Sequence, residues 1–334
     1  MTSRTTLKDL AQAAGLAVST VSQALRGEGT VSRQTCLRIQ ALAMEMGYVP
    51  NPVIASMASK RPASKKSAPA PVAILVSDQG VASLSIPRIA QRRADALGYH
   101  LKAFLMPHGH ERELARTLYH QGYVGVILDM LYGYDRIPEF ETDRFSVVKR
   151  GRDFFPVPFH TVRHSAFDEI QLAWNEIRKR GYKRIGVILF EHPVRHPDDV
   201  ARHGAVLQSQ FDLGADETAI PAIHCPFGEE KTAIPKWFRR HRPDAILAFH
   251  IGEYFVLLDA GIPVGTKIGF ACMNLTEEYL PNISGIVDSI PEQIERAVDL
   301  IDMQLRHHIT GPAEKPTSTL ISPTWNEGTT LRPL

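Results

Sequence analysis

TLKDLAQAAGLAVSTVSQALR, residues 6–26, is the stretch from which the fold can be inferred. Its first half places apolar residues at the helical spacing i, i+3, i+4 and i+7, namely Leu7, Leu10, Ala11 and Ala14. Thr6 stands where an N-cap is needed, and Asp9 is three residues on, close enough to complete a capping box. Gly15 then breaks the pattern. The stretch therefore predicts a short first helix that ends at a glycine.

A second short helix is expected from about Val18. Its apolar face consists of Val21, Ala24 and Leu25, and its other face of Ser19, Thr20, Ser22, Gln23 and Arg26. Two short helices joined at a glycine, the second with small hydrogen-bonding side chains outward, are typical of a helix-turn-helix that reads the DNA major groove. An ordinary helical hairpin packed in a core remains an alternative at this point.

A third helix is predicted after Ser32, which can cap it. Its apolar stripe is Cys36, Ile39, Ala43 and Met46, and Gly47 supplies the stop. Three helices of this kind can close a small core. The motifs TLKDLAQAAGLAVSTVSQALRG (6–27), VSRQT (31–35) and GYVPNP (47–52) together resemble the headpiece of the lactose and galactose repressor family of bacterial transcription regulators.

The resemblance implies roles for residues of the headpiece. It implies that three residues face base edges, namely Val18, Ser19 and Gln23. It implies phosphate contacts from a larger set: Thr6, Thr20, Ser22, Ser32, Thr35, Tyr48 and Asn51. Ala17 is a departure, because the family often has Ser there. Gln can pair bidentately with adenine, so Gln23 is expected to set the preference at one symmetric base pair.

The segment that follows the headpiece is expected to act as a hinge. Asn51 can cap a helix and Pro52 suits its first position, but about eight residues make a marginal helix in water. The resemblance implies that two such hinge helices pack together in the minor groove of the operator. Met57 falls at the position of the apolar side chain that wedges into the central base step, where Leu is usual. A plain linker is the alternative.

Charge is distributed unevenly along the chain. Its 334 residues carry a net charge of +2, whereas residues 1–71 hold nine basic and three acidic side chains. A basic N-terminal part followed by a mildly acidic remainder suits a protein that binds a phosphate backbone with its N-terminal part.

The three cysteines form no CxxC pair, and the sequence contains no secretory signal and no apolar run of membrane-spanning length. We therefore expect a cytoplasmic protein with reduced cysteines.

From Pro71 onward strands and helices alternate, which predicts parallel sheets covered on both faces. Strands are expected at 72–76, 101–105, 124–129, 145–149, 184–190, 219–224, 245–249, 267–272 and 285–287. Helices are expected at 86–97, 111–121, 167–180 (capped by Ser165), 201–212, 232–240, 253–260 and 291–306. The two series predict two doubly wound lobes. The resemblance implies that these lobes form a periplasmic-binding-protein-like core. In such a core the chain crosses from one lobe to the other three times, and these crossings are expected near 160–165, 286–290 and 316–322.

The expected fold is thus multidomain: an all-α helix-turn-helix headpiece followed by an α/β two-lobed core. The domains are a headpiece at 1–50, a hinge helix and linker at 51–71, and an effector-binding and dimerisation core at 72–334. Within the core, lobe 1 is expected at about 72–163 plus 289–317. Lobe 2 is expected at about 164–286 plus 320–334.

Ligands of open α/β sheets lie beyond the carboxyl ends of the strands, and these ends carry a mixture of polar and aromatic residues here. The mixture suits a sugar or another small polar ring. The candidate effector-binding residues are Ser77, Asp78, Tyr132, Arg195, Arg202, His250, Asn274 and Asp288. Asp78 with Asn274 is the pair expected to contact the effector from opposite lobes.

Four positions depart from the pattern common in the family. Ser165-Ala166 stand where an Asp-Asn pair is usual, and Ala201 replaces an Arg, with Arg202 displaced by one. Phe249-His250 replaces Asn-Asp, and Asn274 replaces an Asp. A pyranose bound in the common manner is therefore not implied, and a divergent effector, or none, is allowed.

Enzymes are disfavoured because no catalytic constellation is present. The sequence has no HExxH, no GxSxG and no Gly-rich phosphate loop, and His192, His196 and His203 lack metal-ligand spacing. No metal or cofactor is expected.

The favoured interpretation is a homodimeric repressor that binds a pseudo-palindromic DNA operator, with a small-molecule effector bound between the core lobes. The alternatives are a solute-binding protein without a DNA role and a DNA-binding protein that has no ligand.

Overall fold

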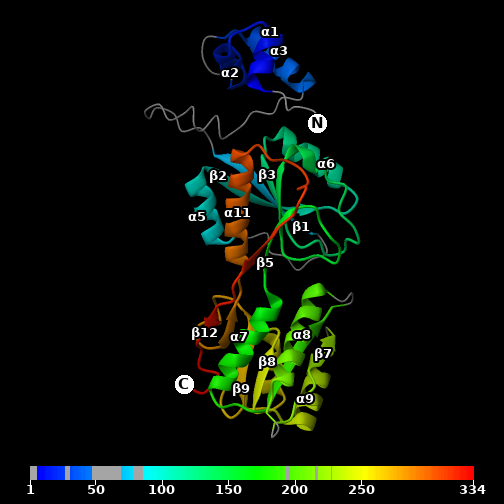
Figure 1. Ribbon diagram of the computed structural model, residues 1–334, viewed down its shortest axis with the longest axis vertical. Helices are drawn as coiled ribbons and strands as arrows, with labels where there is room; N and C mark the ends of the chain where they lie inside the picture. Colours follow the sequence, from blue (N-terminus) through cyan, green and yellow to red (C-terminus); the bar gives the residue numbers. More distant parts are fainter. Residues whose placement is uncertain are drawn as a thin grey trace. The chain divides into compact units, whose positions relative to one another are not determined.

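The computed structural model describes residues 6–26, 31–46, 69–77, 86–192, 196–214, 217–226 and 228–334. The chain divides into two compact units, Met1–Ala68 and Pro69–Leu334. Unit 1 contains the helices α1 (Leu7–Ala14), α2 (Val18–Arg26) and α3 (Arg33–Glu45) (Figure 1). No helix among the described residues is long and apolar enough to cross a membrane.

The ends of α1 confirm the signals in the sequence. The Thr6 side chain accepts a hydrogen bond from the Asp9 amide, and the Asp9 carboxylate accepts one from the Thr6 amide at 2.8 Å. Gly15 takes the left-handed conformation, with φ of 65°, which a residue without Cβ adopts at no steric cost. At α3, Ser32 caps the helix by accepting from the Thr35 amide at 3.2 Å. The expected stop at Gly47 lies outside the described residues.

One apolar stripe from each helix closes the core of unit 1. Its fully or nearly fully buried members are Leu10, Ala11, Val21, Ala24, Ile39 and Ala43. Cys36 and Met46 pack against this cluster, as the spacing of the third helix predicts. Burial of these side chains supplies most of the stability of such short helices, because each would be marginal alone.

Unit 2 contains two sheets of mainly parallel strands, which confirms the predicted fold class (Figure 1). In the described residues the first sheet has the order β11-β5-β4-β3-β1-β2, with every pair parallel. Its strands are β1 (Ala70–Ser77), β2 (Tyr99–Met106), β3 (Gly125–Leu128), β4 (Ser146–Arg150), β5 (His160–His164) and β11 (Ser318–Ile321).

The second sheet has the order β12-β10-β9-β8-β6-β7 and is parallel except at β12. Its strands are β6 (Ile185–Glu191), β7 (Ile223–Pro226), β8 (Ala245–Ala248), β9 (Gly269–Leu275), β10 (Ser284–Val287) and β12 (Trp325–Asn326). The helices of unit 2 are α5 (Arg88–Leu97), α6 (Glu111–His120), α7 (Ala166–Lys179), α8 (Pro197–Phe211), α9 (Glu230–His241), α10 (Gly252–Asp259) and α11 (Ile290–Arg306), with a 3₁₀ turn at Thr142–Arg144.

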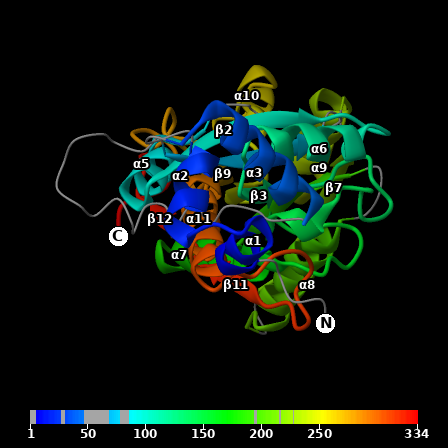
Figure 2. The same cartoon turned by 90° about the horizontal axis from the view of Figure 1, so that it is seen from above.

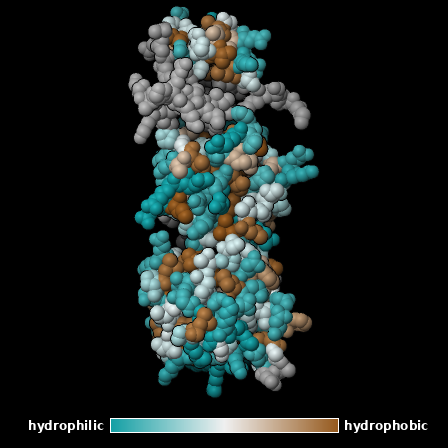
Figure 3. Space-filling view, turned by 60° about the vertical axis from the view of Figure 1, so that its left-hand side comes forward, coloured by the Kyte–Doolittle hydropathy of each residue, from teal (hydrophilic) through white to brown (hydrophobic). Residues whose placement is uncertain are grey.

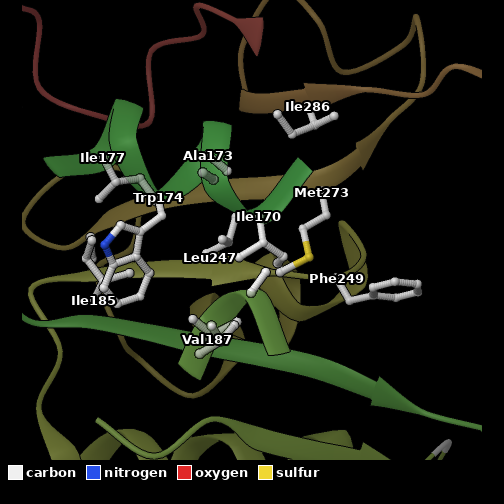
Figure 4. Packing of buried hydrophobic residues seen from close by; sticks show 14 of the residues in the cluster. Ile170, Ala173, Trp174, Ile177, Ile185, Val187, Leu247, Phe249, Met273 and Ile286 are labelled. Atoms are coloured by element: carbon white, nitrogen blue, oxygen red, sulfur yellow. The ribbon is translucent and has the colours of Figure 1, made fainter. Parts of the chain in front are cut away.

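Each sheet with its helices forms one lobe. α11 follows the second-sheet strand β10, yet it packs on the first sheet beside α5 (Figures 1 and 2). Gly125 permits this contact, since a Cβ there would lie 2.6 Å from an Ile301 methyl group. α7, in turn, follows β5 of the first sheet and packs on the second. Its Ile170, Ala173, Trp174 and Ile177 face Val187 and Leu247 (Figure 4).

The chain therefore passes between the lobes after β5, after β10 and after β11. The sequence does not predict strands at residues 160–164 and 318–321, which lie beside two of these passages. They form β5 and β11, which pair in parallel and extend the first sheet. Their short, half-polar sequences lack the continuous apolar run of a buried strand, since both lie at the margin of that sheet.

The largest differences from the predicted element boundaries are at the starts of α8 and β7. α8 begins at Pro197 rather than near residue 201, because His196 acts as its N-cap in a capping box with Asp199. Histidine is not a usual capping residue, so the signal was missed although Pro197 suits the first helical position. β7 covers Ile223–Pro226 instead of 219–224. On the surface of unit 2, polar side chains predominate in the view of Figure 3, and apolar ones occur in small groups.

Candidate functional site

The outer face of α2 is the candidate DNA-reading surface. Val18 is 41% exposed at the first turn, and Ser19 and Gln23 are exposed as well. On the opposite side of the same helix, Val21 and Ala24 are fully buried. Burial of the inner face against α1 and α3 fixes the rotation of α2, so the three predicted base-reading side chains share one solvent-facing surface.

The predicted phosphate-contacting residues gather at helix starts. Thr6 caps α1, and Ser32 caps α3 while its Oγ lies 2.8 Å from Thr35 Oγ1. Thr20 and Ser22 are half-exposed on α2. Amide groups at a helix N-terminus point outward with the positive end of the helix dipole, an arrangement that favours phosphate. The remaining predicted contacts, Tyr48 and Asn51, lie outside the described residues, as do the wedge residue Met57 and the hinge 51–59.

In unit 2, polar side chains from both lobes meet beyond the strand ends. Of the predicted effector-binding residues, Asp78 and Arg195 lie outside the described residues. Ser77, at the end of β1, is 1% exposed and its hydroxyl donates to the Tyr132 carbonyl. Burial raises the pKa of Tyr132, whose hydroxyl also lies in the field of Arg150 of lobe 1 and Arg202 of lobe 2.

Arg202 of α8 is the centre of the lobe 2 part. It is 5% exposed, and its Nη2 lies 3.3 Å from His164 Nε2. Its ion pairs with Glu169 and Asp199 are loose, at 3.8 and 3.7 Å. Its guanidinium carbon lies 4.6 Å from the centroid of the Phe249 ring, a cation–π contact. Arg202 is thus buried and paired, but without a tight hydrogen bond to a carboxylate.

Aromatic rings line the same region. The ring of His250, just after β8, packs edge-on against Phe249 with centroids 4.4 Å apart, and against Phe190 at 5.5 Å. His192 Nδ1 lies 2.7 Å from an Asp199 carboxylate oxygen. Partial burial of a side chain that is still 51% exposed, and secondly the charge of Arg202, lower the pKa of His250 to about 4, so this ring is neutral at physiological pH. Phe249 itself lies at the edge of the lobe 2 core, near Met273 (Figure 4).

The other two predicted residues have partial structural roles. The Asn274 side-chain amide donates to the Phe249 carbonyl at 2.8 Å, which holds the β8 end. The Asp288 carboxylate accepts from the Ile290 amide at 3.0 Å, and burial raises its pKa. Tyr134, two residues after Tyr132, instead belongs to the lobe 1 core and stacks on His108.

Sequence reasoning missed four charged residues at the end of lobe 1. Arg150 pairs with Asp129, and Lys149 pairs with Asp153 at 3.2 Å, with both side chains of the second pair almost completely buried. Burial lowers the pKa of Lys149 and raises that of Asp153. In sequence, Lys149 and Arg150 look like the solvated end of an apolar strand. Only the sheet order, which buries β4 between β3 and β5, places them inside.

His196 joins the two lobes. Its Nδ1 accepts from the Asp198 amide at 3.1 Å, so the proton is on Nε2, which donates to the Arg152 carbonyl of lobe 1 at 2.8 Å. Phe154 of lobe 1 packs edge-on against the same ring, with centroids 4.9 Å apart. Arg152 also reaches Asp198, at 3.7 Å. The N-terminus of α8 therefore contacts lobe 1 through a neutral imidazole and through the ion pair of Asp198 with Arg152.

Several buried polar atoms at this site have no hydrogen-bond partner among the described residues. They are Arg150 Nε, Asp153 Oδ2, Glu169 Oε2, Asp198 Oδ1 and Arg202 Nε. Each such atom costs about 1–3 kcal/mol when left unsatisfied. Burial also raises the pKa of Glu169 to about 7 despite the neighbouring Arg202. The site therefore contains both donors and acceptors that lack a hydrogen-bond partner. No group of three metal-ligating side chains occurs in the described residues.

Known proteins resemble the chain over both units. A family model described as "Bacterial regulatory proteins, lacI family" matches residues 6–51. The HTH-type transcriptional regulator DegA of Bacillus subtilis (strain 168) is 32% identical over 305 residues, which cover 86% of this chain and 88% of the relative.

Two solved structures agree with the fold. A transcriptional regulator CelR–cellobiose complex has a TM-score of 0.59 at 16% identity, covering 98% of this chain and 100% of that one. The lac repressor dimer bound to operator and the anti-inducer ONPF has a TM-score of 0.56 at 18% identity, covering 98% of this chain and 99% of that one.

Proposed function

The chain belongs to the lacI family of bacterial regulatory proteins, which are DNA-binding transcription regulators and not enzymes, and from this we propose that it is an operator-binding repressor controlled by a small polyhydroxylated effector. It binds a pseudo-palindromic operator as a homodimer. The effector binds between the lobes of unit 2 and changes operator affinity.

The exposed face of α2 is the observation that carries the DNA part. Val18, Ser19 and Gln23 present one apolar contact, one hydroxyl and one amide to a groove, without a charged side chain among them. Phosphate binding falls to Thr6, Thr20, Ser22, Ser32 and Thr35, and to Tyr48 and Asn51 beyond the described residues. Selection of bound fragments from a random DNA pool tests this assignment. A two-fold symmetric consensus supports it, and enrichment of no sequence contradicts it.

The unpartnered atoms between the lobes support the class of effector. Arg150 Nε and Arg202 Nε need acceptors, while the Asp153, Glu169 and Asp198 oxygens need donors. A hydroxyl group both donates and accepts, so a ligand with several hydroxyls satisfies both kinds of atom at once. Phe249 and His250 offer ring faces and edges for the apolar side of such a ligand. A sugar or a sugar derivative fits these requirements, together with contacts from Ser77, Tyr132, Asn274 and Asp288.

Coupling between the lobes and the headpiece is assigned to the hinge. Effector binding changes the contact between His196 and Arg152, because both lie beside the unpartnered atoms. The change alters how hinge residues 51–59 can pack in the minor groove, where Met57 acts as the wedge. A thermal-shift screen of sugars and polyols on the protein, followed by operator titration with each hit, tests this step. A ligand that shifts the melting temperature without changing operator affinity contradicts it.

A further inference from the structure

The edge of the second sheet at which its strands begin carries a row of exposed basic side chains. β9, β8 and β6 are neighbours, and the register aligns their first residues. Lys267 precedes β9 by two residues, Arg242 precedes β8 by three and Lys183 precedes β6 by two, and all three are exposed. Neighbouring strands lie about 4.8 Å apart, so this row is about 10 Å long. The candidate effector-binding residues of lobe 2 lie at the opposite edge of the sheet.

The end of α9 adds to this row. The Arg184 guanidinium donates to two carbonyl groups at the end of α9, one of them that of Arg242 at 3.2 Å, which attaches α9 to the start of β6. Lys236, Arg239 and Arg240 are exposed and have the spacing i, i+3 and i+4, so they share one face of the last turns of α9. We call six residues the basic edge: Lys183, Lys236, Arg239, Arg240, Arg242 and Lys267.

Several carboxylates near the basic edge have other partners. Asp244, just before β8, accepts from the amides of Lys183 and Arg184 at 2.9 Å, one through each carboxylate oxygen. Three carboxylates of lobe 2 pair with Arg178 or Arg180, namely Glu176, Glu217 and Glu327. In the described part of the chain, no carboxylate forms an ion pair with a member of the basic edge. The edge is therefore positively charged, although residues 72–334 together are acidic.

Arg242 has a strained backbone that its local structure does not explain. Its φ is 47°, in the left-handed region that glycine adopts without steric cost, and it stands at the C-cap of α9, where glycine is common. His308 is the only other residue in the described ranges that has a positive φ and is not glycine. Strain of this kind is found where a side chain has a function. A binding role for the Arg242 cation, in the middle of the row, accounts for the strain.

We propose that the basic edge binds the phosphate backbone of a second DNA duplex while the headpiece binds the first. Duplex DNA carries one negative charge per about 1.7 Å of its axis, so several phosphates lie opposite a row about 10 Å long. Arginine binds phosphate through two parallel N–H groups, and three of the six residues are arginines. Backbone contacts carry no sequence information, so the second duplex can have any sequence. The protein thereby bridges two segments of DNA.

A protein partner fits this surface less well. Protein interfaces have aromatic or apolar residues at their centre, whereas residues 181–184, 236–244 and 265–268 contain no exposed large apolar side chain. In the view of Figure 3, the lower end of lobe 2 is mostly hydrophilic. Binding of a phosphate backbone requires cations and no such apolar centre.

Capture of a second duplex by the full-length protein tests the proposal. A duplex of random sequence, long enough for two headpieces, is fixed to beads and loaded with protein, and a labelled duplex is then added. We expect the parent to capture the labelled duplex, and Arg239→Glu/Arg240→Glu to capture at least about fivefold less per bound protein. Arg136→Glu/Lys231→Glu is the matched control, because it changes the charge equally at exposed positions outside the basic edge, and it should capture as much as the parent. No capture by the parent, or equal capture by the two double variants, overturns the proposal.

Arg242→Gly separates DNA binding from folding. Glycine adopts the left-handed conformation without strain, so we expect a melting temperature equal to or above that of the parent. Capture of the labelled duplex should nevertheless fall at least about twofold, because one cation is lost. His308→Gly relieves the same strain elsewhere and should leave capture unchanged. Capture by Arg242→Gly equal to that of the parent, or an equal loss in both glycine variants, overturns the proposal.

Discussion

His196 Nε2 donates a hydrogen bond to the carbonyl oxygen of Arg152 over 2.8 Å, and this bond links lobe 2 of unit 2 to lobe 1. The same ring accepts from the Asp198 amide through Nδ1, so only the neutral imidazole with its proton on Nε2 satisfies both partners. Protonation would place a second N–H against the Asp198 amide. One contact between the lobes therefore depends on the protonation state of this histidine.

Replacement of His196 by Asn should weaken the contact between the lobes and leave α8 intact. Asn is a good N-cap, but its amide is too short to reach Arg152. We expect a loss of about 0.5–1.5 kcal/mol in the free energy of unfolding at pH 7, the worth of one hydrogen bond. Chemical denaturation measures it. Loss of helical circular dichroism in the variant would show that His196 serves the helix and not the junction.

The stability difference between the parent and His196→Asn should depend on pH. Burial lowers the pKa of His196 in the folded state, so the unfolded chain binds its proton first as the pH falls. The contribution of His196 is fully present above its ordinary pKa of about 6.5 and decreases as the pH falls below that value. The difference between the two proteins isolates this group from the other titrating residues. A difference that is constant from pH 7.5 to 5 contradicts a neutral, buried His196 in the folded state.

Arg202→Gln should abolish the response to effector and leave operator affinity unchanged. Loss of the Arg202 guanidinium removes the cation above the Phe249 ring and a hydrogen-bond donor to the ligand. Breaking a buried ion pair costs about 3–5 kcal/mol in the free energy of unfolding. For Arg202→Gln we expect a loss at the lower end of this range, because the raised pKa of Glu169 allows its carboxyl group to become neutral. Arg178→Gln is the control, since Arg178 pairs with Glu217 elsewhere on lobe 2. A normal effector-dependent shift in Arg202→Gln would remove Arg202 from the site.

Gln23→Ala should relax base preference at one symmetric pair of positions in the operator. Loss of a bidentate amide contact costs about 1–3 kcal/mol at the matching base and little elsewhere. Gln12→Ala is the matched control, because Gln12 is an exposed glutamine on α1. Binding assays on operators with single base changes measure both variants. If Gln23→Ala weakens all operators equally, Gln23 contacts the backbone and not a base.

Met57→Gly should weaken operator binding several-fold or more while the headpiece stays folded. The reason is loss of the wedge that unstacks the central base step. Hydrogen exchange of amides 51–59 provides the second measurement, with protection expected to rise on operator binding. Equal protection with and without operator would exclude the hinge as the coupling element.

Local signals in the headpiece allowed its helices to be predicted closely. The Thr6 and Asp9 box, the left-handed Gly15 and the Ser32 cap are interactions between residues three or four apart, so sequence contains them directly. The doubly wound lobes followed from the alternation of strands and helices. β5 and β11 could not be predicted because neither has an apolar run, and because β11 pairs with a strand more than 150 residues away in sequence.

The site between the lobes was less accessible to prediction. His250 is predicted from its place after a strand and Arg202 from the family resemblance. Lys149, Arg150, Asp129 and Asp153 are not predicted, because burial of a charged side chain depends on which strands flank it. The role of His196 could not be predicted, since it depends on a carbonyl group 44 positions away in sequence.

Selection of DNA from a random pool by the full-length protein, with Gln23→Ala selected in parallel, is the most direct test of the account. The account predicts a two-fold symmetric consensus for the parent, and for Gln23→Ala the same consensus with preference lost at one symmetric base pair. Recovery of no consensus by the parent, or of an identical consensus at every position by Gln23→Ala, would contradict it.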